Sequence, residues 1–262
     1  MADNVQIETV PSIQVREMWE RQQPIFARIY REGIAAVVQS MPDAAKLFRS
    51  STCIIKCIDE GVPGDGLHMA GSGILRSSEA VRDMVQKANA EGVTSHTGCG
   101  AAQLLFTETY GHAPTPGELD AFAEEKARAI AGLCGIPYTG QIGVLSRPPE
   151  LHIARIVYYV SSADFDHTVG NILPPGFTVS RRYMGLEDAL DETALGVNIA
   201  FGHHGFGDLI SADAPFVLCA VGDPTDPNLG EDQLRKELKA VQEQFPQGRV
   251  IIDGFNAPPP VS

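Results

Sequence analysis

The stretch PFVLCAV, Pro215–Val221, is an apolar run typical of a buried strand. A helical pattern follows over Glu231–Phe245, and the segment RVIID, Arg249–Asp253, predicts another short strand. A strand, a helix and a strand in this order are typical of a right-handed crossover that joins two parallel strands. The end of the chain therefore predicts an α/β protein.

The same alternation extends toward the N-terminus. The runs HIARIVYYV (His152–Val160) and TCIIKCI (Thr52–Ile58) predict buried strands, and EGVTSHTGCGAAQLL, residues 91–105, predicts a short strand, a glycine-rich turn and the start of a helix. Helical patterns cover Val15–Ser51, Ser78–Ala90 and Pro116–Leu133. Because strands alternate with helices, we expect a mainly parallel central sheet flanked by helices.

The domain organisation predicted from the sequence is simple. We find no internal repeat, no low-complexity tract and no clear linker, so we expect a single domain over residues 1–262. Within it, residues 1–50 are expected to form an N-terminal helical arm, and residues 111–143 a helical insertion.

Composition and charge exclude several classes of function. The chain has 262 residues, of which 44% are hydrophobic, and its formal net charge is −13. Such a charge disfavours binding to nucleic acid or to an anionic membrane surface. No apolar run approaches the ~20 residues that span a bilayer, and the first residues do not resemble a secretory signal. With five cysteines, an odd number, the sequence favours a reduced, cytoplasmic protein.

Two predicted strand ends carry residues that bind metals. Cys57 ends the strand TCIIKCI, while His96 ends the next strand, with Cys99 three residues later. In a parallel sheet, two strand ends can face one crevice, where α/β proteins usually place their ligands. Two thiolates and an imidazole are ligands that zinc prefers, with one position left for water or a carboxylate. We therefore predict a zinc site at Cys57, His96 and Cys99.

The alternative for each cysteine is a small hydrophobic role in the core. We assign Cys53, Cys134 and Cys219 to that role, because a lone buried cysteine usually packs as a small hydrophobic residue. A histidine and a cysteine three residues apart are weak evidence for metal on their own. The prediction strengthens because a further cysteine, followed closely by Asp59, ends the preceding strand.

These residues resemble a known family. Cys57–Gly61 (CIDEG) resembles the CxDxR segment of the β-class carbonic anhydrases, and His96–Ala101 (HTGCGA) resembles their HxxCGA segment. Gly64–Gly71 (GDGLHMAG) is similar to the stretch that lies between those two segments. The resemblance covers roughly residues 50–105, and the rest of the chain agrees only in its general α/β alternation.

The resemblance implies a Rossmann-like fold, a homodimer or higher homo-oligomer, and one Zn²⁺ per subunit. It further implies the reversible hydration of CO2 to bicarbonate by hydroxide bound to that zinc. In this reading Cys57, His96 and Cys99 are the zinc ligands. Asp59 is the catalytic acid, which either orients the zinc-bound water or binds the zinc in a closed resting form. The simpler alternative for Asp59 is a carboxylate that caps a loop.

The chain departs from the family at two places. Gly61 replaces the arginine that pairs with the aspartate, and His68-Met69 replaces an Arg-Asn pair. Another cation could take the place of the missing arginine, and the candidates nearby in sequence are Lys56, Arg76 and Arg82. Without such a cation, Asp59 would be freer to swing onto the zinc.

Three other functions therefore stay open. One is the hydrolysis of another linear heterocumulene, CS2 or COS, if residues 111–143 narrow the approach to the zinc. Another is a catalytically silent zinc protein, in which Asp59 completes a structural site, and the loss of the arginine favours it. A nucleotide-binding enzyme is the weakest, because Gly64–Gly73 (GDGLHMAGSG) lacks clean GxGxxG spacing.

The remaining histidines give weaker signals. His203 and His204 lie in a glycine-rich loop and could carry protons or bind a second metal, but an ordinary solvated loop is the better interpretation. His112, His152 and His167 have no partner at a typical spacing, so we expect them to be structural or surface residues.

Overall fold

The computed structural model describes residues 10–48, 52–144, 147–148, 151–161, 164–202 and 205–258. In chain order, the elements are α1 (Val10–Glu32), α2 (Ile34–Gln39), η1 (Ala44–Leu47), β1 (Ile54–Lys56), β2 (Leu67–His68), η2 (Ala70–Gly73), α3 (Ser78–Ala88), β3 (Gly92–His96), α4 (Gly100–Tyr110), α5 (Pro116–Cys134), β4 (Tyr138–Ile142), β5 (Ile156–Val160), η3 (Val169–Asn171), β6 (Phe177–Ser180), α6 (Leu186–Phe201), β7 (Phe216–Gly222), α7 (Glu231–Gln242) and β8 (Val250–Asn256). The predicted α/β class is confirmed.

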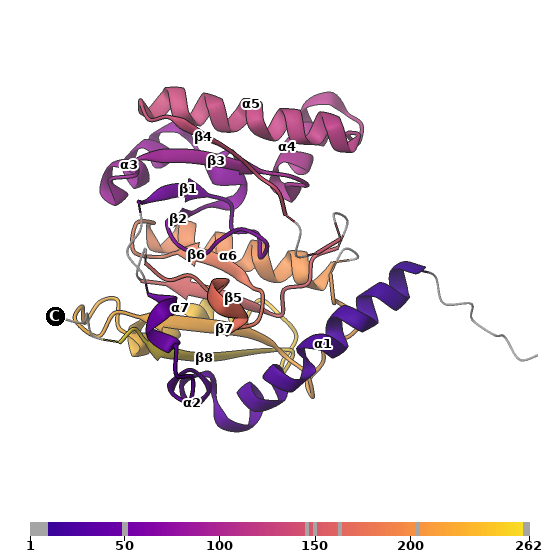
Figure 1. Cartoon of the computed structure of the whole chain (residues 1–262), viewed down its shortest axis with the longest axis vertical. Coiled ribbons are helices and arrows are strands. Elements are labelled where there is room, and N and C mark those ends of the chain that lie inside the picture. The colour runs from indigo at the N-terminus through magenta and orange to yellow at the C-terminus, as the bar shows by residue number, and fades with distance from the viewer. Residues whose placement is uncertain are drawn as a thin grey trace, which may run out of the picture.

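The strands form two parallel sheets instead of one central sheet. Their orders are β2-β1-β3-β4 and β6-β5-β7-β8, so the second sheet repeats the strand order of the first, although the sequence shows no repeat. Figure 1 shows the two sheets one above the other, with β2 and β6 at the edges that face each other. There the Ser180 hydroxyl accepts a hydrogen bond from the His68 amide and donates one to the Gly66 carbonyl.

Helices cover both sheets. In the first half α5 packs on β3, while in the second half α7 packs on β7 and β8, and α6 packs on β5 and β6. The first helices of the chain, α1 and α2, lie on the opposite face of the second sheet, where Phe26 and Ile34 meet Tyr158 and Val217. Because this sheet is buried on both faces, β5 and β7 are apolar at nearly every position, as the sequence indicated.

Local sequence explains where the helices begin. The Ser77 hydroxyl accepts a hydrogen bond from the Ala80 amide at the start of α3, and Thr115 and Glu118 form a reciprocal capping box at the start of α5. The predicted helices over 78–90 and 116–133 are thus confirmed within two residues. The expected insertion, residues 111–143, comprises α5 and β4, and β4 extends the first sheet beside β3.

Helix α6 and the strands β2, β4 and β6 were not predicted, and β1 is shorter than the apolar run Thr52–Ile58 indicated. The segment from His152 to Arg155, expected in the strand, precedes β5 as an irregular connection. No helix in the described part of the chain is both long enough and apolar enough to cross a membrane.

Candidate metal centre

The topology of the first sheet brings the predicted ligands together. Strands β1 and β3 lie in the middle of this sheet. The chain runs from β1 to β2 on one side, and from β3 through α4 and α5 to β4 on the other side. Such a reversal leaves a crevice at the carboxyl ends of the two central strands. Cys57 directly follows β1, His96 ends β3, and Cys99 immediately precedes α4. All three residues therefore meet at one point.

The geometry of this cluster suits a metal ion. One side-chain atom each of Cys57, His96 and Cys99 lies within 4.8 Å of the others. The three residues are 5%, 1% and 2% exposed, so they lie inside the protein and not on its surface. Thiolates and imidazole are strong metal ligands, and three of them leave one position open on a four-coordinate ion. Cys57, His96 and Cys99 are thus placed to bind a metal ion.

The imidazole of His96 is oriented for this role. Its Nδ1 lies 3.0 Å from the carbonyl oxygen of Thr97, and since a carbonyl only accepts, this nitrogen carries the proton. The other nitrogen, Nε2, is buried and has no hydrogen-bond partner among the described residues. A buried polar atom without a partner is costly, and coordination to a metal removes that cost.

The environment moves the pKa values of the two thiols in opposite directions. A hydrogen bond from Cys57 lowers the pKa of Cys99 against the effect of burial, and the amides of Ala101 and Ala102 at the start of α4 lower it further. The same thiol–thiol hydrogen bond, together with burial, raises the pKa of Cys57 well above its usual value. The Cys57 sulfur also accepts a 3.1 Å hydrogen bond from the amide of Gly71. Because a metal binds the thiolate form, metal binding displaces the protons that these thiols hold.

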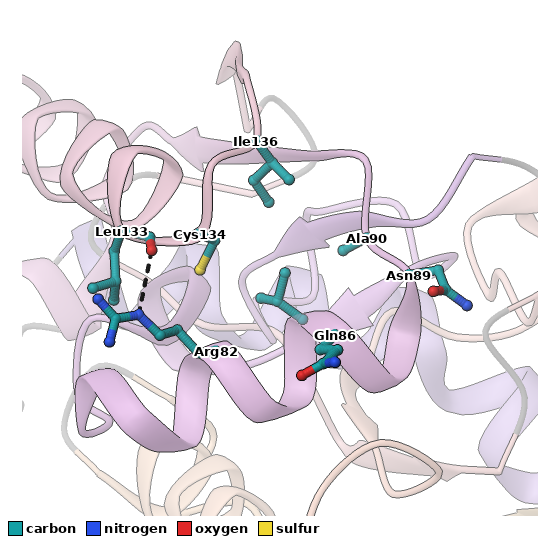
Figure 2. A pocket seen from close by; sticks show the side chains of 8 residues that line it. Arg82, Gln86, Asn89, Ala90, Leu133, Cys134 and Ile136 are labelled. Carbon is teal, nitrogen blue, oxygen red and sulfur yellow. Dashed lines mark hydrogen bonds between the residues drawn. The ribbon is translucent and has the colours of Figure 1, made fainter.

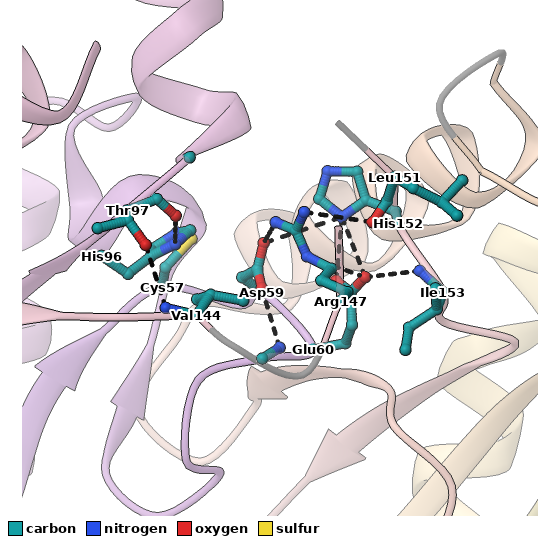
Figure 3. A network of polar contacts seen from close by, with 12 residues as sticks. Cys57, Asp59, Glu60, His96, Thr97, Val144, Arg147, Leu151, His152 and Ile153 are labelled. Atoms are coloured by element: carbon teal, nitrogen blue, oxygen red, sulfur yellow. Dashed lines mark hydrogen bonds and ion pairs between the residues drawn. The ribbon is translucent and has the colours of Figure 1, made fainter. Parts of the chain in front are cut away.

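Asp59 is held by a cation that the sequence analysis did not identify. Its Oδ2 accepts a 2.6 Å hydrogen bond from Nη2 of Arg147, and its Oδ1 accepts one of 2.9 Å from the Gly61 amide (Figure 3). Both side chains of this ion pair are buried, at 3% and 1% exposure. Burial opposes ionisation of Asp59, but the positive charges of His96, Arg147 and His152 overcome it and lower the pKa of this carboxyl to about 2.

The three cations proposed from their sequence positions pair elsewhere. Lys56 binds Asp65 at 2.6 Å, Arg76 binds Asp188 and Glu192 on α6, and Arg82 donates to the Leu133 carbonyl. None of these three candidates is the partner of Asp59 in the contacts described, because each binds another acceptor. Arg147 reaches Asp59 across 88 residues of sequence, from the connection between β4 and β5.

Glu60 extends the network to a histidine. Its carboxylate lies 3.0 and 3.2 Å from Nδ1 of His152, 3.4 Å from Nε of Arg147, and accepts a 2.8 Å hydrogen bond from the Ile153 amide. Asp59, Glu60 and His152 form a second tight group of polar side chains beside the metal ligands. His152 was predicted to be a structural or surface residue, and its contact with the Glu60 carboxylate was not predicted. The residues next to it in the sequence do not indicate that contact.

The other predicted residues lie apart from this network or outside the described residues. His203 and His204 fall outside the described residues. His68 is fully buried with its Nδ1 2.7 Å from the Cys57 carbonyl, and burial lowers its pKa to about 4, so it stays neutral and does not replace an arginine. His112 is exposed at the far end of α4.

Two cavities in the described part of the chain could hold a small molecule. One, of about 420 Å³, lies between α3 and the end of α5, and its lining includes Arg82 and Cys134 but neither a carboxylate nor an imidazole (Figure 2). The other, of about 320 Å³, is lined by Glu60, Gly61, Ile153 and His167 among others, so it adjoins the polar network. The second cavity is therefore the one that offers space for a small molecule next to the candidate centre.

Fold and site together define an α/β protein with a Cys2His cluster placed for a metal ion. Comparison of the chain with models of protein families, with curated proteins and with solved structures gave no match.

Proposed function

We propose that this protein is a zinc enzyme that catalyses the reversible hydration of CO2 to bicarbonate. The observation that carries the proposal is the combination of a buried Cys2His cluster with a neighbouring aspartate that a buried arginine holds in place. A metal that only stabilised the fold would not need a fixed, ionised carboxylate beside it. The resemblance of the ligand segments to the β-class carbonic anhydrases points the same way.

Zinc is the metal that this donor set favours. Two thiolates and one imidazole are soft or borderline ligands, which select zinc over magnesium or calcium. When bound, zinc lowers the pKa of a coordinated water to about 7 and so supplies a nucleophile at neutral pH. The three protein ligands leave one position of a tetrahedral ion open for that purpose.

Asp59 would orient the reacting molecule. Each of its carboxylate oxygens already accepts one hydrogen bond, from Gly61 or from Arg147, and a carboxylate has lone pairs for about four. It is therefore fixed in position and still able to accept a further hydrogen bond. Because its pKa is low, it stays ionised at neutral pH and acts as an acceptor, never as a donor.

Arg147 bears on the alternative of a silent zinc protein. That alternative drew its support from Gly61, which left Asp59 without the expected partner and free to bind the ion. Arg147 supplies the guanidinium from another part of the chain and binds Asp59 Oδ2. This ion pair supports an open coordination position over a closed, four-coordinate structural site.

The test is CO2 hydration by stopped flow on purified protein, with zinc quantified in the same sample. We expect about one zinc per chain and rapid hydration at neutral and alkaline pH. CS2 and COS are assayed in parallel, because they are linear heterocumulenes open to the same attack. Activity on CS2 or COS without CO2 hydration would reassign the substrate. Zinc without any of the three activities would refute an enzymatic role, and a chain that binds no zinc would refute the whole proposal.

A further inference from the structure

The cavity beside the polar network is much larger than CO2 requires. Its volume is about 320 Å³, whereas one water molecule occupies about 30 Å³ in the liquid, and CO2 is a molecule of only three heavy atoms. Volumes of roughly 300–1,000 Å³ are typical of sites that hold organic ligands. A molecule that fills this cavity therefore carries an organic group in addition to the atoms that react.

Both halves of the chain form the walls of this cavity. The first half contributes the loop after β1, and the second half contributes the connection between β5 and β6. Asp166 joins the two segments, because its Oδ1 accepts a 2.9 Å hydrogen bond from the Gly64 amide. The ring of His167 stacks on Tyr158 at 5.1 Å, and its Nε2 lies 3.5 Å from the Glu60 carbonyl. The packing of the two halves therefore fixes the shape of the cavity.

The walls suit an uncharged, apolar group. Among the lining residues, only Glu60 and His167 can carry a charge. The Glu60 side chain is 0% exposed, because its carboxylate is turned toward Arg147 and the Ile153 amide. Burial lowers the pKa of His167, so its ring is neutral at neutral pH. The apolar lining residues are Pro63, Ile153, Leu173 and Pro175. These walls favour an uncharged organic group over an anion such as bicarbonate.

One hydrogen bond joins the cavity wall to the acid of the centre. Gly61 lines the cavity, and its amide donates 2.9 Å to Oδ1 of Asp59. Glu60 and Ile153 also line the cavity, and both belong to the polar network (Figure 3). Gly61 has no side chain to fill this space, and Arg147 supplies the guanidinium from another direction. A molecule held in the cavity therefore lies next to the candidate centre.

We propose that this centre hydrolyses organic isothiocyanates, R–N=C=S, with the uncharged group R held in the cavity, an inference that rests on the proposed zinc chemistry. Like CO2, an isothiocyanate has two double bonds at one electrophilic carbon. The oxygen of a deprotonated water forms a bond to this carbon. The π electron pair of the C=N bond moves to nitrogen, which takes up a proton, and the product is the thiocarbamic acid R–NH–CO–SH. Its C–N bond then breaks, the nitrogen takes the thiol proton, and an amine and COS leave. The sum is R–N=C=S + H2O → R–NH2 + COS, so no oxidant or reductant is needed.

The experiment offers methyl, ethyl and propyl isothiocyanate, and CO2 in parallel, to the purified, zinc-loaded protein. Amine release is followed by ¹H NMR. The five cysteines can each add one isothiocyanate, so only turnover well beyond that number is catalysis. The value of kcat/KM should rise about fourfold with each added methylene, because the apolar walls bury it. A protein that hydrates CO2 but turns over none of the isothiocyanates would overturn the inference, as would a rate independent of chain length.

Leu173, which lines the cavity and is 5% exposed, allows a test by substitution. Leu173→Trp fills the cavity and should lower kcat/KM for propyl isothiocyanate about 10-fold, with CO2 hydration and zinc content unchanged. The matched control Leu133→Trp fills the cavity of Figure 2 and should leave both activities unchanged. If Leu173→Trp loses both activities, Leu173→Ala decides: the enlarged cavity should shift the preference to longer chains, and an unchanged preference would refute the inference.

The outcomes for the wild type separate this inference from the proposed function. Hydrolysis of isothiocyanates without hydration of CO2 would refute the CO2 function alone and support the inference. Zinc-loaded protein that acts on neither substrate would refute both.

Discussion

Removal of Arg147 is the sharpest test of the network. Arg147→Met takes away the guanidinium that lies 2.6 Å from Asp59 and 3.4 Å from Glu60, in a place where all three side chains are at most 3% exposed. The buried carboxylates of Asp59 and Glu60 then remain with less positive charge beside them. Breaking a buried pair in this way costs about 3–5 kcal/mol, whereas an exposed pair contributes about 0–1 kcal/mol. We therefore expect the free energy of unfolding to fall by about 3 kcal/mol.

The pKa of Asp59 gives an independent check on this magnitude. The fall from the ordinary 3.8 to about 2 corresponds to roughly 2 kcal/mol, at 1.36 kcal/mol for each pH unit. His96 and His152 contribute to it, so only part belongs to Arg147. Because the pKa is lower in the folded state than in the unfolded chain, this stability is complete above pH 3.8 and is lost as the pH falls toward 2. Measurements at pH 7 therefore capture the full effect.

The assay is urea unfolding followed by circular dichroism, with a chelator in every sample so that metal binding does not contribute. A loss of about 3 kcal/mol lowers the midpoint by about 1 M if the slope is about 3 kcal/mol/M. The matched control is Lys87→Ala, which removes an ion pair of the same 2.6 Å length that is exposed on α3. The double variant Arg147→Met with Asp59→Asn should recover part of the loss, since the unpaired charge is removed as well. A loss below 1 kcal/mol in Arg147→Met, equal to that of Lys87→Ala, would refute the buried pair.

Four further predictions follow from the same contacts. Elemental analysis should show that Cys99→Ser loses most of its zinc. The control Cys134→Ser, which changes a thiol in the cavity of Figure 2, should keep its full zinc content. Equal zinc in both variants would refute the ligand assignment. Gly61→Arg should leave CO2 hydration unchanged by stopped flow, because Arg147 already pairs with Asp59, and a clear increase would show that this pair is insufficient. Glu192→Ala should weaken zinc affinity about 10-fold in a chelator competition. Glu192 accepts a hydrogen bond from the Ala70 amide and so positions the turn whose Gly71 amide donates to the Cys57 sulfur. Glu192→Gln keeps an acceptor and should bind zinc with nearly normal affinity. At a free zinc concentration 1,000 times Kd, bound zinc should raise the free energy of unfolding by about 4 kcal/mol, and a chelator should remove this gain. Identical urea midpoints with and without zinc would argue against a bound metal in the folded chain.

The sequence by itself determined the class of fold and the positions of the residues placed to bind a metal ion. Both depend on local patterns: apolar runs alternate with helical periods, and strand ends carry Cys57 and His96. In a parallel sheet, the ends of neighbouring strands necessarily lie close together, so adjacency follows from the pattern alone. The α/β class and the convergence of these ligands with Cys99 were predicted and are confirmed.

Only the tertiary structure decided how the chain divides into two sheets and which groups surround the ligands. The two sheets share a strand order without a detectable repeat, because strand order depends on the burial of apolar faces, which many different sequences satisfy. Arg147 and His152 lie in an irregular connection, where no period constrains side-chain direction, and their partners are 88 and 92 residues away. Long-range packing alone brings these charges together, and so the cation that replaces the expected arginine could not be identified from the sequence.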